Sequence, residues 1–247
     1  MKNLIRAELL KLRTTRVFWG YIAAALAFVP VSIALAMTTG SDATPLTSSE
    51  GLRGVMSAAS AGGILVLLIG ISMMAGEFRH NTATTTFLIS PARGRVVAAK
   101  LVAGGLVGVG VAILASLLTL VTALPWLAAR DIDVSLFSAD VVTPLLGALI
   151  STALAAMVGI GLGALMPNQT LAITVVIVWT SVVEALLVGF VPEIGRWFPT
   201  GAASALGGTP TAEGGLLPFW AAALVLTGYG LAFAASGTRL VMRRPIT

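Results

Sequence analysis

Long runs of apolar residues without any charge dominate the chain, and they predict helices long enough to cross a membrane. These runs cover residues 17–41, 54–76, 101–129, 141–183 and 214–238. A span needs about 20 apolar residues to cross roughly 30 Å of hydrocarbon. The fourth run is too long for one helix, and its middle, residues 166–169, reads Met-Pro-Asn-Gln, which favours a turn. The sequence therefore predicts six spans, near residues 17–38, 54–76, 98–124, 142–166, 170–190 and 217–237.

The first run could be mistaken for a secretory signal, because residues 34–36 read Ala-Leu-Ala and resemble a cleavage site. The apolar region of a signal peptide is only about 7–15 residues long, and this run is longer. We therefore interpret it as an uncleaved first span.

Composition indicates the same class of protein. The 247 residues are 57% hydrophobic and only 10% charged, with a mean hydropathy of +0.99. A soluble domain carries about 25% charged residues, so this chain has too few charges to cover a surface that faces water. We predict an all-α polytopic membrane protein with a single transmembrane domain over residues 1–247. Without cysteine, disulfides, thiolate metal sites and cysteine nucleophiles are excluded.

The basic residues indicate which side of the membrane each connection faces. If the N-terminus lies in the cytoplasm, all but three of the 15 Lys and Arg residues fall on the cytoplasmic side, and only Arg53, Arg130 and Arg196 lie outside. Cytoplasmic loops are enriched in Lys and Arg. We therefore predict a multi-pass protein of the cell membrane with both termini in the cytoplasm. The same topology accounts for the net charge of +5 without a nucleic-acid partner.

Residues 1–16 have a helical pattern ahead of the first span. Ile5, Leu9 and Leu12 share one face, and basic residues lie elsewhere on the helix. This pattern is typical of a short amphipathic helix on the membrane surface. The alternative is a basic flank that only sets the topology.

Residues 77–97 join the second and third spans through a basic, threonine-rich stretch. Asn81 or Thr82 can cap a short helix, and Ser90 followed by Pro91 can start the next one. We expect three basic residues to anchor the third span at the lipid headgroups: Arg93, Arg95 and Lys100. The short helix suits docking to a cytosolic partner, and an ordinary solvated loop fits the residues equally well.

Two stretches resemble a known family. They are "RAELLKLRTTRVFW" at residues 6–19 and "GEFRHNTATTTFLISPARGRVVAAKL" at residues 76–101. Both are similar to the permease subunits of type-2 ABC exporters, particularly those of high-GC Gram-positive bacteria. The likeness extends over the whole chain. Many relatives have Gly before the Thr of this motif, where this chain has Asn81 before Thr82.

The resemblance implies a coupling helix between the second and third spans that docks in a cleft of a separate cytosolic ABC ATPase. It also implies an external or re-entrant segment over residues 191–216, and a second permease copy or a related permease in a homo- or heterodimer. ATP and Mg are then bound by the partner ATPase, and this chain holds no cofactor. The residues that correspond to the ATPase-binding helix are Glu77, Phe78, Arg79, His80, Asn81, Thr82, Thr84, Thr85 and Phe87.

No catalytic residue and no metal site are predicted in this chain. A P-loop lysine follows a glycine, whereas Lys2, Lys11 and Lys100 follow Met, Leu and Ala. The single histidine, His80, lies in a cytoplasmic connection. We therefore do not expect the chain to be an enzyme, and any ATP hydrolysis belongs to another subunit.

Glu184 is the one acidic residue within the predicted spans. A carboxylate inside a membrane is costly unless it is paired, protonated or hydrated. It could line the substrate path and favour a cationic substrate, or it could form a structural ion pair with Arg196. We favour the ion pair.

Together these features predict the membrane permease subunit of an ATP-driven ABC exporter for a small molecule, lipid or peptide. A non-transporting immunity or regulatory membrane protein is the main alternative. A secondary transporter is a weaker alternative, because ion-coupled carriers usually have several ionisable groups near the midplane.

Overall fold

The computed structural model describes residues 1–39, 45–79, 93–166, 168–208 and 215–243, and within these ranges every regular element is a helix. In chain order the elements are α1 (Lys2–Thr14), α2 (Arg16–Thr39), α3 (Ser49–Met56), η1 (Ser57–Ser60), α4 (Gly63–Arg79), α6 (Arg93–Ala128), α7 (Ala139–Leu165), α8 (Gln169–Val178), η2 (Trp179–Glu184), α9 (Ala185–Phe190), α10 (Pro192–Gly195), α11 (Pro199–Gly207) and α12 (Phe219–Arg243).

Six helical stretches in the described ranges are long and apolar enough to span a membrane: Arg16–Thr38, Ser49–Glu77, Gly94–Ala128, Ala139–Leu165, Gln169–Phe190 and Phe219–Leu240. Each corresponds to one predicted span, so the all-α, six-span class is confirmed. The second span begins earlier than expected because α3 and η1 extend it. Ser48 starts this extension, since its side chain accepts a hydrogen bond from the backbone N–H of Gly51.

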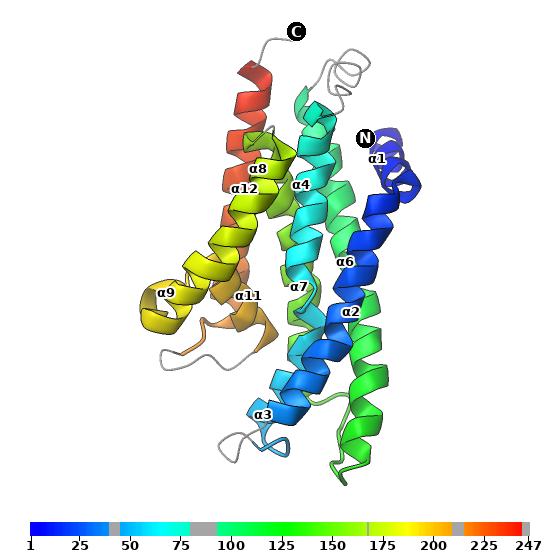
Figure 1. Cartoon of the computed structure of the whole chain (residues 1–247), viewed down its shortest axis with the longest axis vertical. Coiled ribbons are helices and arrows are strands. Elements are labelled where there is room, and N and C mark those ends of the chain that lie inside the picture. Colours follow the sequence, from blue (N-terminus) through cyan, green and yellow to red (C-terminus); the bar gives the residue numbers. More distant parts are fainter. Residues whose placement is uncertain (40–44, 80–92, 167, 209–214, 244–247) are drawn as a thin grey trace.

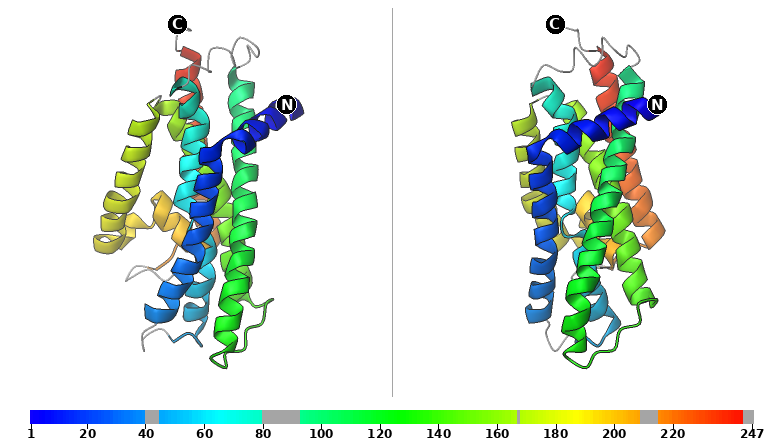
Figure 2. Two further views of the ribbon diagram at one scale, coloured as in Figure 1. Left: turned by 45° about the vertical axis from the view of Figure 1, so that its right-hand side comes forward. Right: turned by 90° about the vertical axis from the view of Figure 1, so that its right-hand side faces the viewer.

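The spans form an elongated bundle with the N-terminus and the C-terminal end of α12 at the same end (Figure 1). We call this the terminal end and the opposite end the far end. Helix α4 ends, and α6 begins, at the terminal end (Figure 1). There α1 runs across the bundle, against α6 and α2, instead of along it (Figure 2). An amphipathic helix in this position was predicted from residues 1–16.

Helix α7 is the central element of the bundle, and it packs against α4, α6, α11 and α12. Glycines permit these close approaches. A Cβ at Gly108 of α6 would lie 2.7 Å from the Cα of Ala153 on α7, and a Cβ at Gly159 of α7 would collide with the carbonyl oxygen of Leu67 on α4. Small residues let helix backbones approach closely in membranes. These glycines therefore pack helices within the subunit.

The segment between the fifth and sixth spans folds back into the bundle. Helix α11 lies nearer the middle of the molecule than α3 or the far end of α6 (Figure 1). Its Ala202 and Leu206 are fully buried and share a core with Ala222 and Leu226 of α12. The described part of the predicted external segment therefore belongs to the packed structure and is not a free loop.

Candidate functional site

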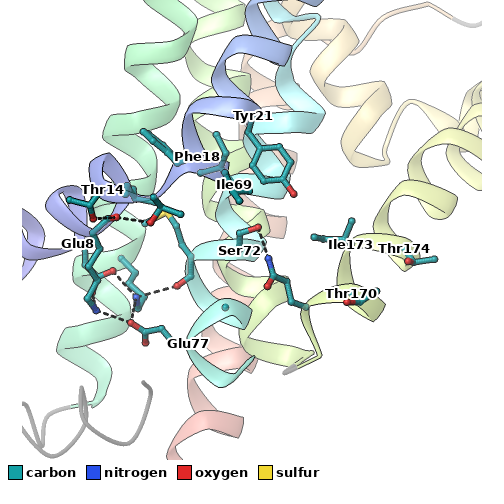
Figure 3. A pocket seen from close by; sticks show the side chains of 18 residues that line it. Glu8, Thr14, Phe18, Tyr21, Ile69, Ser72, Glu77, Thr170, Ile173 and Thr174 are labelled. Carbon is teal, nitrogen blue, oxygen red and sulfur yellow. Dashed lines mark hydrogen bonds and ion pairs between the residues drawn. The ribbon is translucent and has the colours of Figure 1, made fainter. Parts of the chain in front are cut away.

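Four charged side chains from three helices meet inside the terminal end. The Nζ of Lys100 on α6 lies 2.6 Å from Oε2 of Glu8 on α1 and 2.9 Å from Oε1 of Glu77 on α4. The Nζ of Lys11 on α1 lies 2.9 Å from Oε1 of Glu77 and 3.2 Å from Oε1 of Glu8. We call these four residues the ion cluster (Figure 3). Each carboxylate contacts both amines, so the cluster joins α1, α4 and α6.

Lys100 is the most buried member of the ion cluster, with 1% of its surface exposed. A lysine ammonium has three N–H donors. Here its partners are Glu8, Glu77 and the backbone carbonyl of Met73, which lies 3.2 Å away. A buried charge is costly unless it is paired and hydrogen-bonded. The two buried carboxylates and the carbonyl therefore make the burial of this amine possible.

Lys11 forms the exposed edge of the ion cluster, with 52% of its side chain exposed. Partial burial lowers the pKa of its amine, but the hydrogen bond to Glu77 and the charges of Glu77 and Glu8 outweigh burial, so the pKa is raised above its ordinary value of 10.5. The contribution of Lys11 to stability is therefore fully present below pH 10.5 and is lost as the pH rises through the raised pKa.

The amphipathic pattern of α1 brings Glu8 to the cluster. Ile5, Leu9 and Leu12 pack against a core that includes Phe18, so the predicted shared face is confirmed. Residues three and four apart are neighbours on a helix surface. Glu8 is three residues after Ile5 and four before Leu12, and it therefore points to the same core.

A pocket of about 710 Å³ opens beside the ion cluster, between α1, α2, α4, α6 and α8. Glu77 is on one side of it, and Ile173 of α8 is on the other (Figure 3). The Nε2 of Gln169 donates a hydrogen bond to Oγ of Ser72 at 3.1 Å and connects α8 to α4. The pocket therefore combines a charged wall with a wall of apolar and hydroxyl groups.

The first of the residues predicted to bind an ATPase, Glu77, is a member of the ion cluster. Glu77 lies in α4, and its buried carboxylate faces the bundle, so its effect on docking would be indirect, through the position of α4. Phe78 and Arg79 belong to the last turn of α4. Their side chains lie outside the described part of the chain, together with His80, Asn81, Thr82, Thr84, Thr85 and Phe87.

The position of Lys100 corrects the sequence prediction. Arg95 is exposed, as a headgroup anchor requires, but Lys100 is buried because it lies on the face of α6 that meets Glu8 and Glu77. These two are the only acidic residues on the predicted cytoplasmic side. The presence of two acidic residues in otherwise basic segments could have indicated that they have a buried cationic partner.

Glu184 ends the π-helical turn η2 and is 1% exposed. Its Oε2 accepts hydrogen bonds from the backbone N–H of Thr200, at 2.7 Å, and from the Thr200 hydroxyl. Arg196 forms an ion pair with Glu193, 2.6 Å from Nη2 to Oε2. The contacts of the described residues thus give Glu184 to Thr200 and Arg196 to Glu193, and the expected ion pair between Glu184 and Arg196 is not among them. Thr200 is in the first turn of α11, where backbone N–H groups lack partners within the helix and attract carboxylates.

The ion cluster holds helices α1, α4 and α6 together through ion pairs. Among the described residues, no group of three or more His, Cys, Asp or Glu side chains could hold a metal ion. The cluster balances two cations with two anions, so it can be buried without a ligand. The cluster therefore couples the positions of α1, α4 and α6 at the end of the bundle where α4 ends and α6 begins.

Comparison with known proteins assigns the chain to a family. The family model described as ABC-2 family transporter protein matches residues 4–192. The matched range includes the ion cluster and the first five spans. No curated protein matches the chain. Because the match covers most of the chain and the helices fit a membrane component, the chain belongs to the ABC-2 transporter family, as a multi-pass membrane permease.

Proposed function

We propose that the chain is the permease subunit of an ATP-driven exporter. A separate cytosolic ABC ATPase binds ATP with Mg and hydrolyses it, and the permease moves a small molecule, lipid or peptide out of the cell. Two copies of the chain, or one copy and a related permease, enclose the transport path. Membership of the ABC-2 family supports the partnership with an ATPase.

The observation that carries this proposal is the ion cluster. Residues 80–92 join α4 to α6 and follow Glu77 closely in the sequence. Because Lys100 pairs with both Glu77 and Glu8, a displacement of this connection moves α4, α6 and α1 together. Packed helices shift between discrete arrangements and do not deform continuously. An ATPase shifts the permease between two such arrangements only if it contacts them differently.

The test is ATP turnover by a complex of the chain with its ATPase, reconstituted in lipid nanodiscs. Replacing Phe87 by Ala, or Thr84 and Thr85 by Asp, is expected to lower turnover about tenfold, because loss of one docking anchor is worth about 1–2 kcal/mol. Phe137→Ala is the matched control. Phe137 is 93% exposed in the connection between α6 and α7, and its replacement should leave turnover unchanged.

Unchanged ATPase binding and turnover in both variants would contradict the assignment of the docking segment. Export by the purified chain in vesicles without any ATPase would contradict ATP coupling and favour a secondary transporter. A chain that neither binds a P-loop ATPase nor exports would favour the immunity or regulatory alternative.

A further inference from the structure

A second cavity lies in the far half of the bundle, away from the ion cluster. Its volume is about 500 Å³, and its walls come from α2, α3, η1, α4, α7, η2, α11 and α12. Cavities that bind small molecules typically have volumes of about 300–1,000 Å³. None of the described residues that line it carries a charge. This distinguishes it from the pocket beside the ion cluster.

Hydroxyl groups line this cavity, and four of them, those of Ser57, Ser60, Thr180 and Thr200, already donate their protons to other groups of the chain. The Oγ of Ser57 donates to the carbonyl of Gly54 at 2.7 Å, and the Oγ of Ser60 donates to the carbonyl of Ser57 at 2.8 Å. The Oγ1 of Thr180 donates to the carbonyl of Val176 at 2.8 Å. A hydroxyl has one donor and two acceptor lone pairs. Each of these groups therefore offers the cavity an acceptor and no donor.

Thr200 also donates its hydroxyl proton, and it covers the nearby carboxyl group of Glu184. Both its hydroxyl and its backbone N–H donate to Glu184. Thr200 lines the cavity, whereas Glu184 is 1% exposed and is not among the lining residues. The carboxyl group is therefore covered, and the cavity presents hydrogen-bond acceptors set among apolar side chains such as Leu35, Ile64 and Leu67.

This lining selects by charge and by hydrogen-bonding type. An anion would face acceptor lone pairs and lose its hydration without a cation to replace it. A cation would lose its hydration without contact with a carboxylate among the described lining residues. An uncharged molecule with O–H or N–H groups satisfies the acceptors, and its apolar body fits the remaining walls.

We propose that this cavity binds an uncharged amphipathic molecule that carries hydrogen-bond donors, and that molecules of this class are the cargo of the permease. The statement about cargo rests on the proposed function. The statement about binding does not, because it concerns this chain alone.

The test measures binding of pyrene probes to the purified chain in lipid nanodiscs, without ATPase or nucleotide, by energy transfer from tryptophan. Trp179 is adjacent to the lining residue Thr180. Pyrenebutanol should bind above the level of empty nanodiscs. Its methyl ether, which lacks the donor, should bind about fivefold more weakly, as expected for one hydrogen bond. Pyrenebutyrate, the anion, should bind more weakly still.

Two variants assign the binding to the cavity. A Cβ at Gly63, which lines the cavity, would meet nothing within 4 Å, so Gly63→Phe should fill the cavity and reduce binding at least about tenfold. Gly110→Phe is the matched control, because Gly110 also has open space and does not line the cavity. Thr180→Val removes an acceptor and keeps the shape.

Thr180→Val should weaken pyrenebutanol about fivefold and leave its ether unchanged. Thr227→Val is the control, because the Thr227 hydroxyl also donates to its own helix, at 2.7 Å to the carbonyl of Ala223, and does not line the cavity. If Gly63→Phe fails to fold, the response of the two probes to Thr180→Val decides the question.

Three results would overturn the proposal. They are equal affinity for pyrenebutyrate and pyrenebutanol, equal binding in the Gly63→Phe and Gly110→Phe variants, and no binding above that of empty nanodiscs. The last result would mean that bilayer lipid alone occupies the cavity. Intact probe binding together with no ATPase coupling would overturn the proposed function and the statement about cargo, and would leave the statement about binding standing.

Discussion

Lys100 is the residue on which the ion cluster depends. It contacts both carboxylates from a position that is 1% exposed, whereas Lys11 contacts them from the half-exposed edge. Electrostatic interactions are stronger where water is excluded, and a buried charge that loses its partner is strongly destabilising. Lys100 therefore contributes more to the stability of the protein than Lys11 does, although both contact the same two carboxylates.

Replacing Lys100 by Met tests this difference. It leaves Glu8 and Glu77 buried with only Lys11 as a cation, and we expect a loss of about 3 kcal/mol in the free energy of unfolding. The measurement is thermal or denaturant unfolding of the purified protein in detergent. Lys11→Met is the matched control, with an expected loss of no more than about 1 kcal/mol. Equal losses in the two variants would show that burial does not set the strength of the cluster.

At the scale of elements, the fifth span is interrupted where it meets α11. The helix changes from α8 to the π-helical turn η2 and then to α9. Such turns are rare and often occur at functional sites. Here the turn ends at Glu184, whose carboxyl group accepts both hydrogen bonds from Thr200. This contact connects the fifth span to the folded-back segment, and Thr200 is also a wall of the second cavity.

Glu184→Gln is expected to keep the fold, with a change in unfolding free energy within about 1 kcal/mol, because an amide oxygen can accept the same two hydrogen bonds. Thr200→Val removes one donor from a buried carboxyl group and should cost about 1–3 kcal/mol. Thr227→Val on α12 serves as the control for the loss of a hydroxyl. The measurement is the unfolding midpoint in detergent. A larger loss for Glu184→Gln than for Thr200→Val would mean that the charge of Glu184 holds the contact, and not its hydrogen bonds.

At the scale of the whole molecule, the N-terminus and the C-terminal end of α12 lie at the end where α4 ends and α6 begins (Figure 1). The proposal of a cytosolic ATPase requires this end to face the cytoplasm. The distribution of Lys and Arg predicts the same orientation. The orientation and the proposed docking side therefore succeed or fail together.

Single cysteines can test the orientation, because the chain has none of its own. We expect a membrane-impermeant maleimide to label Phe137→Cys in intact cells and to label Lys2→Cys only after the membrane is permeabilised. Both positions are exposed, so access to the reagent and not burial decides the result. Labelling of Lys2→Cys in intact cells would place the terminal end outside and remove the basis for a cytosolic partner there.

Much of the fold could be predicted from the sequence, because a span is a local property of the chain. A helix in lipid satisfies its own backbone hydrogen bonds, and it needs only a sufficient length of apolar residues. The apolar face of Ile5, Leu9 and Leu12 could be predicted for the same reason. The burial of Lys100 could not, because its partner Glu8 is 92 positions away in the sequence, and only packing brings them together.

The sequence by itself determined the class of protein, the number of spans and the apolar face of α1, since each follows from residues that are neighbours along the chain. The tertiary structure alone decided which charges are buried together, which group holds Glu184, and where an uncharged cavity forms. These depend on contacts between helices that are distant in the sequence. In a chain of similar apolar helices, small residues such as Gly108 and Gly159 set those contacts through backbone approach, and hydrophobic periodicity does not encode them.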